Sequence, residues 1–262
     1  YVAKQLWRSI FKSKTVPADD MIGRRETIRA VLSELGKDHG QSATLVNDAR
    51  STVEKIKTFI QDKKILTLPA PDQCSIIEMP EFQRGFSAAY LNQAPPLDAK
   101  AKSLYAIAPP PSDWPTERQE AFFQEYNRSM LQVLTIHEAY PGHYVQLDYS
   151  NRIDSLVRKV LSSGVFAEGW AVYTEQMRLE EGYGYGDLAL RLHQLKFYMR
   201  AVLNAILDYR MHCSEMSDND ALSLLVDRGF QTSGEAVGKI QRAKQRSWQL
   251  STYFVGRTAF YR

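Results

Sequence analysis

Apolar residues recur at helical spacing in two segments near the start of the chain. Gly36 follows the first segment as a C-terminal cap. An apolar stripe opposite a charged face is typical of a helix that packs on one side against a core. We therefore expect scaffold helices within residues 1–65. The apolar positions are Met21, Ile22, Ile28, Val31, Leu32 and Leu35 in residues 18–35, and Leu45, Val53, Ile56 and Ile60 in residues 43–62.

The pattern changes between residues 66 and 115. Prolines cluster there and interrupt any helical periodicity. Short apolar runs at 74–79, 86–91 and 104–108 favour strands. We expect a small β-element over residues 66–115, with packing as its plain role.

Residues 116–262 return to helical patterns and are expected to form a helical core. Thr116 and Gln119 suit a capping box, and the helical pattern that starts there runs into a helix over 130–140. A polar connection over 148–159 follows, and then another helix over 168–179. The predicted fold is mainly α with a small β-sheet (α+β), in one region spanning residues 1–262. The remaining signals are Gly182, Gly184 and Gly186 as a helix end, Asp187 as the cap of a long helix to His212, and caps at Ser217 with Asp220 and Thr232 with Glu235 for helices ending near Gly229 and Arg246.

Composition excludes several classes of protein. Lys and Arg total 33 against 30 acidic residues, a formal net charge of +3, which is too balanced to predict a nucleic-acid or anionic-membrane partner. No apolar run approaches the roughly 20 residues that span a bilayer, so no membrane insertion is expected. With only Cys74 and Cys213, a disulfide framework or a cysteine metal site is not expected.

Four residues in two segments have the chemistry of a zinc-dependent hydrolase. Such a site needs neutral imidazoles and a carboxylate as ligands, and a further carboxylate that takes a proton from a metal-activated water. His137, His143 and Glu168 suit the first role. Glu138 suits the second, because its side chain leaves a helix about 100° from that of His137.

The spacing of the two histidines requires a break in the helix. In the common H-E-x-x-H arrangement the histidines stand at i and i+4 on one face, whereas His137 and His143 stand at i and i+6. Pro141 cannot donate a backbone hydrogen bond, and Gly142 accepts dihedral angles that other residues avoid. We predict a kink or bulge at residues 140–142 that returns His143 to the side of His137.

Two motifs carry a resemblance to a known family. Residues 137–146, His-Glu-Ala-Tyr-Pro-Gly-His-Tyr-Val-Gln, resemble the H-E-A-x-P-G-H-H-x-Q signature of a large bacterial family of domains of unknown function, placed among gluzincin-like zinc peptidases. Residues 166–176 are similar to its second signature, E-G-W-A-x-Y-x-E-Q. The departures are Tyr144, where the family usually has His, and Asn204, where Arg is expected.

The resemblance implies a gluzincin-like metallopeptidase catalytic portion that binds Zn²⁺. It favours Glu168 as the ligand, and Glu175, two turns later, as a residue that accepts the spare N–H of a ligand histidine. Tyr253 matches a family tyrosine that could donate a hydrogen bond to an oxyanion. Because family members are longer, we expect this chain to be the C-terminal part of a larger protein.

Other polar residues have less specific patterns. Asp208 and His212, at i and i+4, could pair and hold a histidine near the cleft as an oxyanion stabiliser, or form a surface pair at a helix end. His39 and His193 are expected to be exposed scaffold residues. Candidates for gripping a substrate carboxylate are Arg200, Arg242, Arg246 and Arg257.

The sequence leaves three functions open. One is a zinc peptidase, with a peptide or small amide as its substrate. Another is a zinc hydrolase of a non-peptide amide or ester, which the same four residues would serve. The third is a catalytically inactive binding module of the same fold. Substrate identity, oligomeric state and compartment, whether cytoplasmic or periplasmic and secreted, are not specified.

Overall fold

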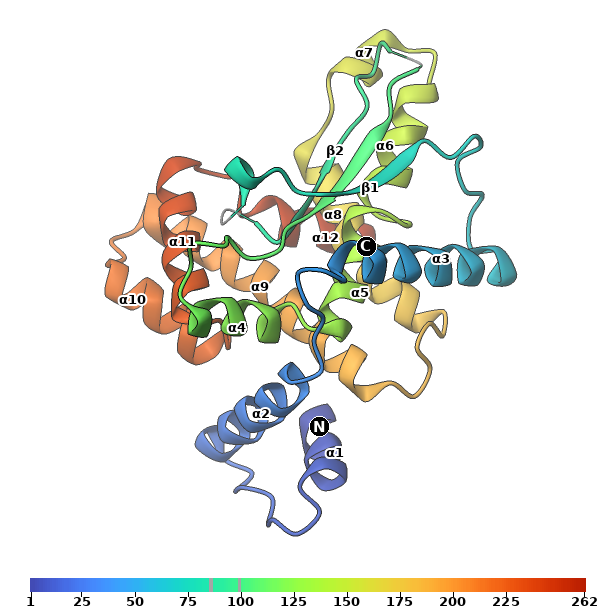
Figure 1. Cartoon of the computed structure of the whole chain (residues 1–262). Coiled ribbons are helices and arrows are strands. Elements are labelled where there is room, and N and C mark those ends of the chain that lie inside the picture. Colours follow the sequence, from blue (N-terminus) through green and yellow to red (C-terminus); the bar gives the residue numbers. More distant parts are fainter. Residues whose placement is uncertain (85–86, 99) are drawn as a thin grey trace.

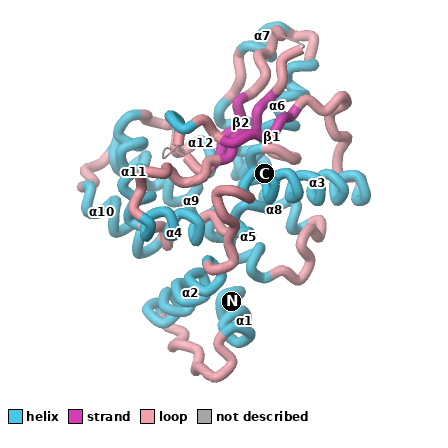
Figure 2. Tube along the Cα trace, viewed as in Figure 1, coloured by secondary structure: helices cyan, strands magenta, loops and turns pink. Residues whose placement is uncertain are grey.

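Helices dominate the computed structural model, which describes residues 1–84, 87–98 and 100–262 (Figure 1). A small sheet lies on one side of the helical body, and the N-terminal helices α1 and α2 extend from the opposite side (Figure 2). The elements are α1 (Val2–Ile10), α2 (Met21–Gly36), α3 (Leu45–Lys63), β1 (Cys74–Glu78), η1 (Glu81–Gln83), β2 (Ala89–Asn92), β3 (Ser103–Ile107), α4 (Thr116–Glu125), α5 (Arg128–Glu138), α6 (His143–Arg152), α7 (Leu156–Val160), α8 (Gly164–Glu180), α9 (Leu188–Cys213), α10 (Asp218–Ser223), η2 (Leu224–Arg228), α11 (Ser233–Gln245) and α12 (Thr252–Phe260).

The strands form one three-stranded sheet in the order β1-β3-β2. β1 runs parallel to β3, and β2 runs antiparallel to it. Tyr105 of the central strand is fully buried, and its hydroxyl lies 3.1 Å from Oγ1 of Thr135 in α5. The sheet therefore packs on the helix that carries His137. The three predicted strands are confirmed, although Phe86, in the second predicted run, lies outside the described residues.

Much of the helical prediction is confirmed, although Gly36 is the last residue of α2 and the cap that follows it is Lys37. α2 and α3 occupy the two predicted apolar segments. The Asp187 side chain accepts a hydrogen bond from Leu190 N at the start of α9, and Ser217 with Asp220 forms a complete capping box. Gly182, Gly184 and Gly186 all have positive φ, which ends α8 in backbone conformations that favour glycine.

Several predicted boundaries are wrong. The segment from Thr116 to Tyr140 is two helices, because the Asn127 side chain accepts hydrogen bonds from Ser129 N and Met130 N and so starts α5 afresh. Thr116 and Gln119 form no capping box, since Gln119 Nε2 donates to Trp114 O. The connection over 148–159 is largely helical, and α8 begins at Gly164, four residues before the predicted start. Helices α1 and α12 were not predicted.

Helices α8 and α12 cross with their backbones in contact. A Cβ atom added at Gly169 would lie 2.4 Å from Gly256 Cα, and one added at Gly256 would lie 2.0 Å from Val165 O. Neither distance accommodates a side chain. This crossing places the helix of Glu168 directly against the helix of Tyr253.

Within the described residues, no helix combines the length and the apolar character needed to cross a membrane.

Candidate metal centre

The predicted break between the two histidines is confirmed. α5 ends at Glu138 and α6 begins at His143. Gly142 N donates to Ile136 O at 3.0 Å, so the chain turns back on the last turn of α5. A Cβ at Gly142 would lie 1.8 Å from His137 O and 2.3 Å from Ile136 O. Only glycine leaves room for this turn, which brings the two imidazole centroids within 4.8 Å of each other.

His137, His143 and Glu168 converge from three helices. Their ligand atoms all lie within 4.8 Å of one another. Glu168 Oε2 is 3.3 Å from His143 Nε2 and 3.7 Å from His137 Nε2. Burial alone would raise the pKa of Glu168, but the two imidazoles outweigh burial and hold this pKa well below its usual value. The cluster therefore favours an ionised carboxylate facing two nitrogen atoms.

The donor set has the chemistry and spacing for a zinc ion. Two imidazoles and one carboxylate are the ligands of a catalytic zinc site, and ligands about 2.0–2.1 Å from a tetrahedral zinc stand about 3.3 Å apart. The separation from His143 is 3.3 Å and equals this value, whereas that from His137 is 3.7 Å, and all three ligand atoms lie within 4.8 Å of one another. Glu168 Oε2 is also buried without a hydrogen-bond donor among the described residues. A buried, unsatisfied carboxylate oxygen is costly unless a cation occupies its side.

Glu175 orients one of the imidazoles. Its Oε1 lies 2.6 Å from His137 Nδ1, and the Glu175 side chain is fully buried. Burial raises the pKa of Glu175 to about 6, which leaves the carboxyl mostly ionised at pH 7. An ionised Glu175 accepts the proton on Nδ1, so Nε2 is the His137 nitrogen that faces Glu168. This is the arrangement that the sequence predicted.

Glu138 lies beside the triad but outside it. It is the last residue of α5, directly after His137, and its side chain is partly exposed. No described residue donates a hydrogen bond to its carboxylate. The negative charge of Glu138 contributes to raising the pKa of His137, which places the two groups in electrostatic contact. A carboxylate that is close to the site, unpaired and open to solvent can take a proton from a nearby water.

Tyr253 borders the same site from α12. Its ring stacks toward His137, with centroids 6.5 Å apart. Its hydroxyl lies 3.0 Å from an Arg242 guanidinium nitrogen and 3.1 Å from Gln249 Nε2. Burial and then the charge of Glu168 raise the pKa of Tyr253 to about 12. The phenol therefore stays protonated at neutral pH and remains a hydrogen-bond donor.

Asp208 and His212, the candidate oxyanion pair, lie at the C-terminal end of α9. Asp208 Oδ1 accepts a hydrogen bond from Trp248 N, and Oδ2 accepts hydrogen bonds from the backbone and hydroxyl of Ser251. His212 Nε2 lies 2.9 Å from Ala243 O and 3.6 Å from Asp208 Oδ1. These contacts hold the connection between α11 and α12 against α9. Among the described residues, none of these contacts joins the pair to the triad, and the oxyanion role of His212 stays a prediction.

The four candidate arginines separate clearly. Arg242 contacts Tyr253, whereas Arg200 pairs with Glu235, Arg246 is exposed, and Arg257 contacts Tyr198 and Gln176. Arg242 thus contacts a residue that borders the candidate centre, and Arg200 also lies over the ring of Phe197, which packs on His137. His39 and His193 were expected to be exposed, and neither is.

Those two histidines are held by hydrogen bonds and packing. His193 is 1% exposed, because its ring nitrogens contact Asn127 Nδ2 and Ala189 O, each at 2.8 Å. His39 is partly buried and stacks on Phe123. Tyr144, where the resembled family has a second histidine, accepts a hydrogen bond from Gln73 N and is also buried.

Two residues near the site were missed by sequence reasoning. Phe197 of α9 packs its ring edge to face with His137, with centroids 5.7 Å apart. Lys239 of α11 lies within electrostatic range of Glu168, whose charge acts on its pKa. Lys239 stands three residues before Arg242, so the helical spacing of two cations was a signal that was available in the sequence.

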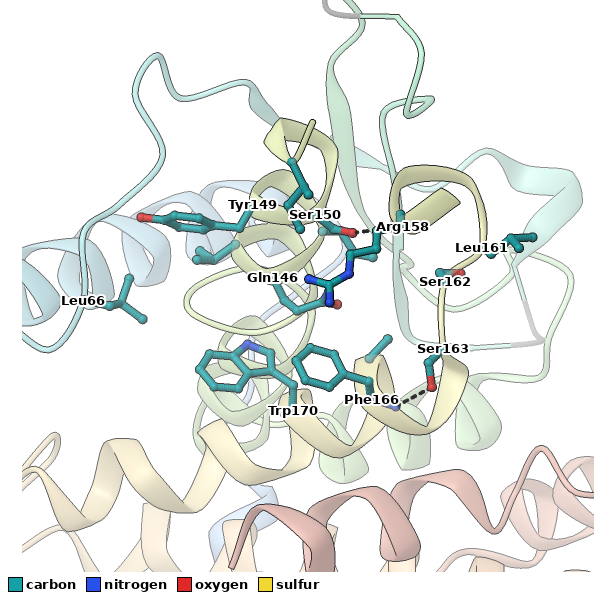
Figure 3. A pocket seen from close by; sticks show the side chains of 14 residues that line it. Leu66, Gln146, Tyr149, Ser150, Arg158, Leu161, Ser162, Ser163, Phe166 and Trp170 are labelled. Carbon is teal, nitrogen blue, oxygen red and sulfur yellow. Dashed lines mark hydrogen bonds between the residues drawn. The ribbon is translucent and has the colours of Figure 1, made fainter. Parts of the chain in front are cut away.

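A separate pocket of about 740 Å³ adjoins the centre on helices α6, α7 and α8. Figure 3 shows Gln146 and Arg158 projecting into it, with Phe166 and Trp170 along one side. Phe166 and Trp170 each stand two residues from Glu168, about 200° around the helix, so they project away from the ligand carboxylate. Trp170 Nε1 donates to Pro141 O at 2.8 Å and thereby ties α8 to the break between the histidines.

Comparison with known proteins gives a family but no activity. The family profile described as "Bacterial protein of unknown function (DUF885)" matches residues 8–262. The chain is similar to a candidate lipoprotein of unknown function from Shewanella oneidensis, at 35% identity and TM-score 0.86, over 99% of this chain and 45% of that one. A candidate lipoprotein from Colwellia psychrerythraea, at 17% identity and TM-score 0.73 over 99% and 47%, has the same fold. The chain spans about half the length of these solved relatives. No curated protein matches it.

Proposed function

The chain belongs to the bacterial DUF885 family, and from that premise we propose that it is the catalytic portion of a gluzincin-like zinc peptidase. The observation that carries the proposal is the convergence of His137, His143 and Glu168, with Glu138 adjacent and unpaired among the described residues. The substrate class would be a peptide or a small amide. The motifs that resemble zinc peptidases supply these same four residues.

The metal fits the cluster, and the roles of the side chains follow from it. A bound Zn²⁺ would polarise a substrate carbonyl and lower the pKa of a water molecule in the site. His137, His143 and Glu168 would hold the ion, and Glu175 would fix the tautomer of His137. The other groups that border the centre supply proton transfer and hydrogen bonding.

Glu138 would take the proton of the attacking water and later deliver it to the leaving amine. Its partly exposed position gives it access to water. The protonated hydroxyl of Tyr253 would donate a hydrogen bond to the oxygen on which negative charge develops. Arg242, which already contacts that hydroxyl at 3.0 Å, would keep the phenol in place.

The test combines metal analysis with one substitution. Protein purified without added zinc should carry about one zinc per chain. Glu138→Gln should keep that zinc while its kcat on a panel of peptides falls by at least about 100-fold, because proton transfer by a positioned side chain contributes roughly 10²–10⁴-fold.

Glu117→Gln, at an exposed carboxylate on α4, is the control and should match the parent. Peptide hydrolysis by Glu138→Gln at the parental rate would refute the mechanism. If the zinc-loaded parent hydrolyses esters but no peptide, the protein is a non-peptide hydrolase and not a peptidase. If the parent hydrolyses neither class of substrate, the result favours a binding module.

A further inference from the structure

Helix α11 carries two cationic side chains, one of which contacts a residue that borders the candidate metal centre. Lys239 and Arg242 are three residues apart, so they lie on the same side of the helix. One Arg242 nitrogen donates to Tyr253 Oη at 3.0 Å and to Gln249 Oε1 at 2.6 Å. Because the Tyr253 ring stacks toward His137, a single phenol connects Arg242 to a metal-binding histidine.

Lys239 has no counterion among the described residues. No carboxylate there lies within ion-pair distance of its ammonium group, and its side chain is partly buried. Burial lowers the pKa of Lys239 to about 7, and Arg200 and Arg242 act in the same direction. Glu235 and Glu168 oppose that shift without cancelling it. The charges of Glu235 and Glu168 thus only partly offset the burial of this ammonium group.

The neighbouring carboxylates are already engaged. Glu235 pairs with Arg200 and also accepts a hydrogen bond from Tyr126. Glu125 pairs with Lys196 at 2.7 Å. Glu168 faces the two imidazoles of the metal centre. A divalent cation there would outweigh the single charge of Glu168, so the surroundings of Lys239 and Arg242 would become more positive when metal binds.

We propose that Lys239 and Arg242 bind the free C-terminal carboxylate of a peptide substrate whose scissile bond lies at the metal centre. The inference rests on the proposed peptidase function and adds a substrate class to it, namely peptides cleaved near their C-terminus. A guanidinium supplies directed N–H donors to a carboxylate, and an ammonium supplies a compact charge beside them. The bound carboxylate would provide the counterion that Lys239 lacks.

Binding is the first measurement, because it is independent of turnover. Zinc-loaded Glu138→Gln protein would be titrated calorimetrically with N-acetyl-trialanine as the free acid and as the C-terminal amide. The free acid should bind at least about tenfold more tightly, as expected for a charge-assisted pair. An amide peptide that ends in aspartate tests whether an acidic side chain serves equally well.

The lysine is then tested on the same background. Lys239→Met keeps the length of the side chain and removes its charge, and should bring the affinities for acid and amide within about threefold of each other. Lys239→Arg should restore at least part of the preference and serves as a second variant if Lys239→Met folds poorly. Lys244→Gln, at an exposed lysine of α11 that pairs with Asp218, is the control and should leave the preference intact.

The outcomes separate this subsite from the peptidase activity. Equal binding of acid and amide, or no binding of the acid at about 10 mM, overturns the subsite even if the parent hydrolyses peptides. Equal binding of the aspartate amide and the free acid overturns the assignment to the C-terminus. A carboxylate preference that disappears in Lys239→Met, without hydrolysis by the parent, supports the subsite and refutes the peptidase.

Discussion

Replacing Glu175 with glutamine tests whether this buried residue supports the metal centre through His137. Glu175 Oε1 and His137 Nδ1 are 2.6 Å apart, and the Glu175 side chain is inaccessible to solvent. A hydrogen bond to a charged group is worth about 1.5–3 kcal/mol, roughly twice a neutral one. Glutamine keeps an acceptor of the same length and removes the charge, so about half of this energy, about 0.8–1.5 kcal/mol, is lost.

This energy corresponds to about a 4- to 12-fold loss of zinc affinity. The upper end of this range meets the lower end of the roughly 10- to 100-fold losses that follow removal of a residue that orients a metal-binding histidine. Competition with a chromogenic chelator at pH 7.5 measures the affinity directly. Thermal denaturation in the presence of a chelator measures the stability of the metal-free variant, so that a folding defect is not mistaken for weaker binding.

Glu181→Gln provides the matched control. Glu181 is an exposed carboxylate at the end of the same helix, and its substitution should change zinc affinity by less than about twofold. If Glu175→Gln binds zinc within threefold of the parent, the carboxylate does not support the ligand histidine. The same conclusion follows if Glu181→Gln loses as much affinity as Glu175→Gln.

Two further predictions concern the backbone break and a buried histidine. Gly142→Ala should lower the free energy of unfolding by about 1–3 kcal/mol and weaken zinc binding, because the new Cβ would meet His137 O at 1.8 Å. Gly238→Ala, whose Cβ meets nothing within 4 Å, should be neutral or stabilising in the same denaturant titration, and equal behaviour of the two variants would contradict the reasoning. Burial lowers the pKa of His193 to about 4 from 6.5, so the unfolded chain binds the additional proton and stability should fall by up to about 3 kcal/mol as pH drops from 6.5 to 4. His193→Gln should reduce this dependence in urea titrations across that range, and an unchanged slope would show that His193 is not its source.

The clustering of His137, His143 and Glu168 could be predicted from the sequence better than the contacts around them. The break between His137 and His143 could be predicted because Pro141 and Gly142 have strong local conformational preferences. The strands and most helix caps could be predicted for the same reason, since their signals lie within a few residues. The prediction that Glu168 joins the two histidines also depended on the second motif, because no residue near Glu168 in the sequence indicates which helix its side chain will face.

The contacts that could not be predicted have tertiary causes. Asp208 and His212 have a spacing that suits a pair, but the connection between α11 and α12 supplies backbone donors that no local pattern reveals. His193 was expected at the surface, and a contact with Asn127, 66 positions away, buries it. The spacing of Lys239 and Arg242 is local, but the effect of the Glu168 charge on Lys239 depends on how α11 packs in the fold. Long-range packing decides these three cases.

The backbone contact between Gly169 and Gly256 leaves no room for a larger side chain on the side of the candidate metal centre formed by α8 and α12. Because main chain meets main chain there, replacing either glycine would force the two helices apart and so displace Glu168 relative to Tyr253. Across from them, α11 contributes long side chains whose length and charge can be exchanged without disturbing that junction. Attempts to alter selectivity should therefore leave the α8–α12 junction alone and begin with α11.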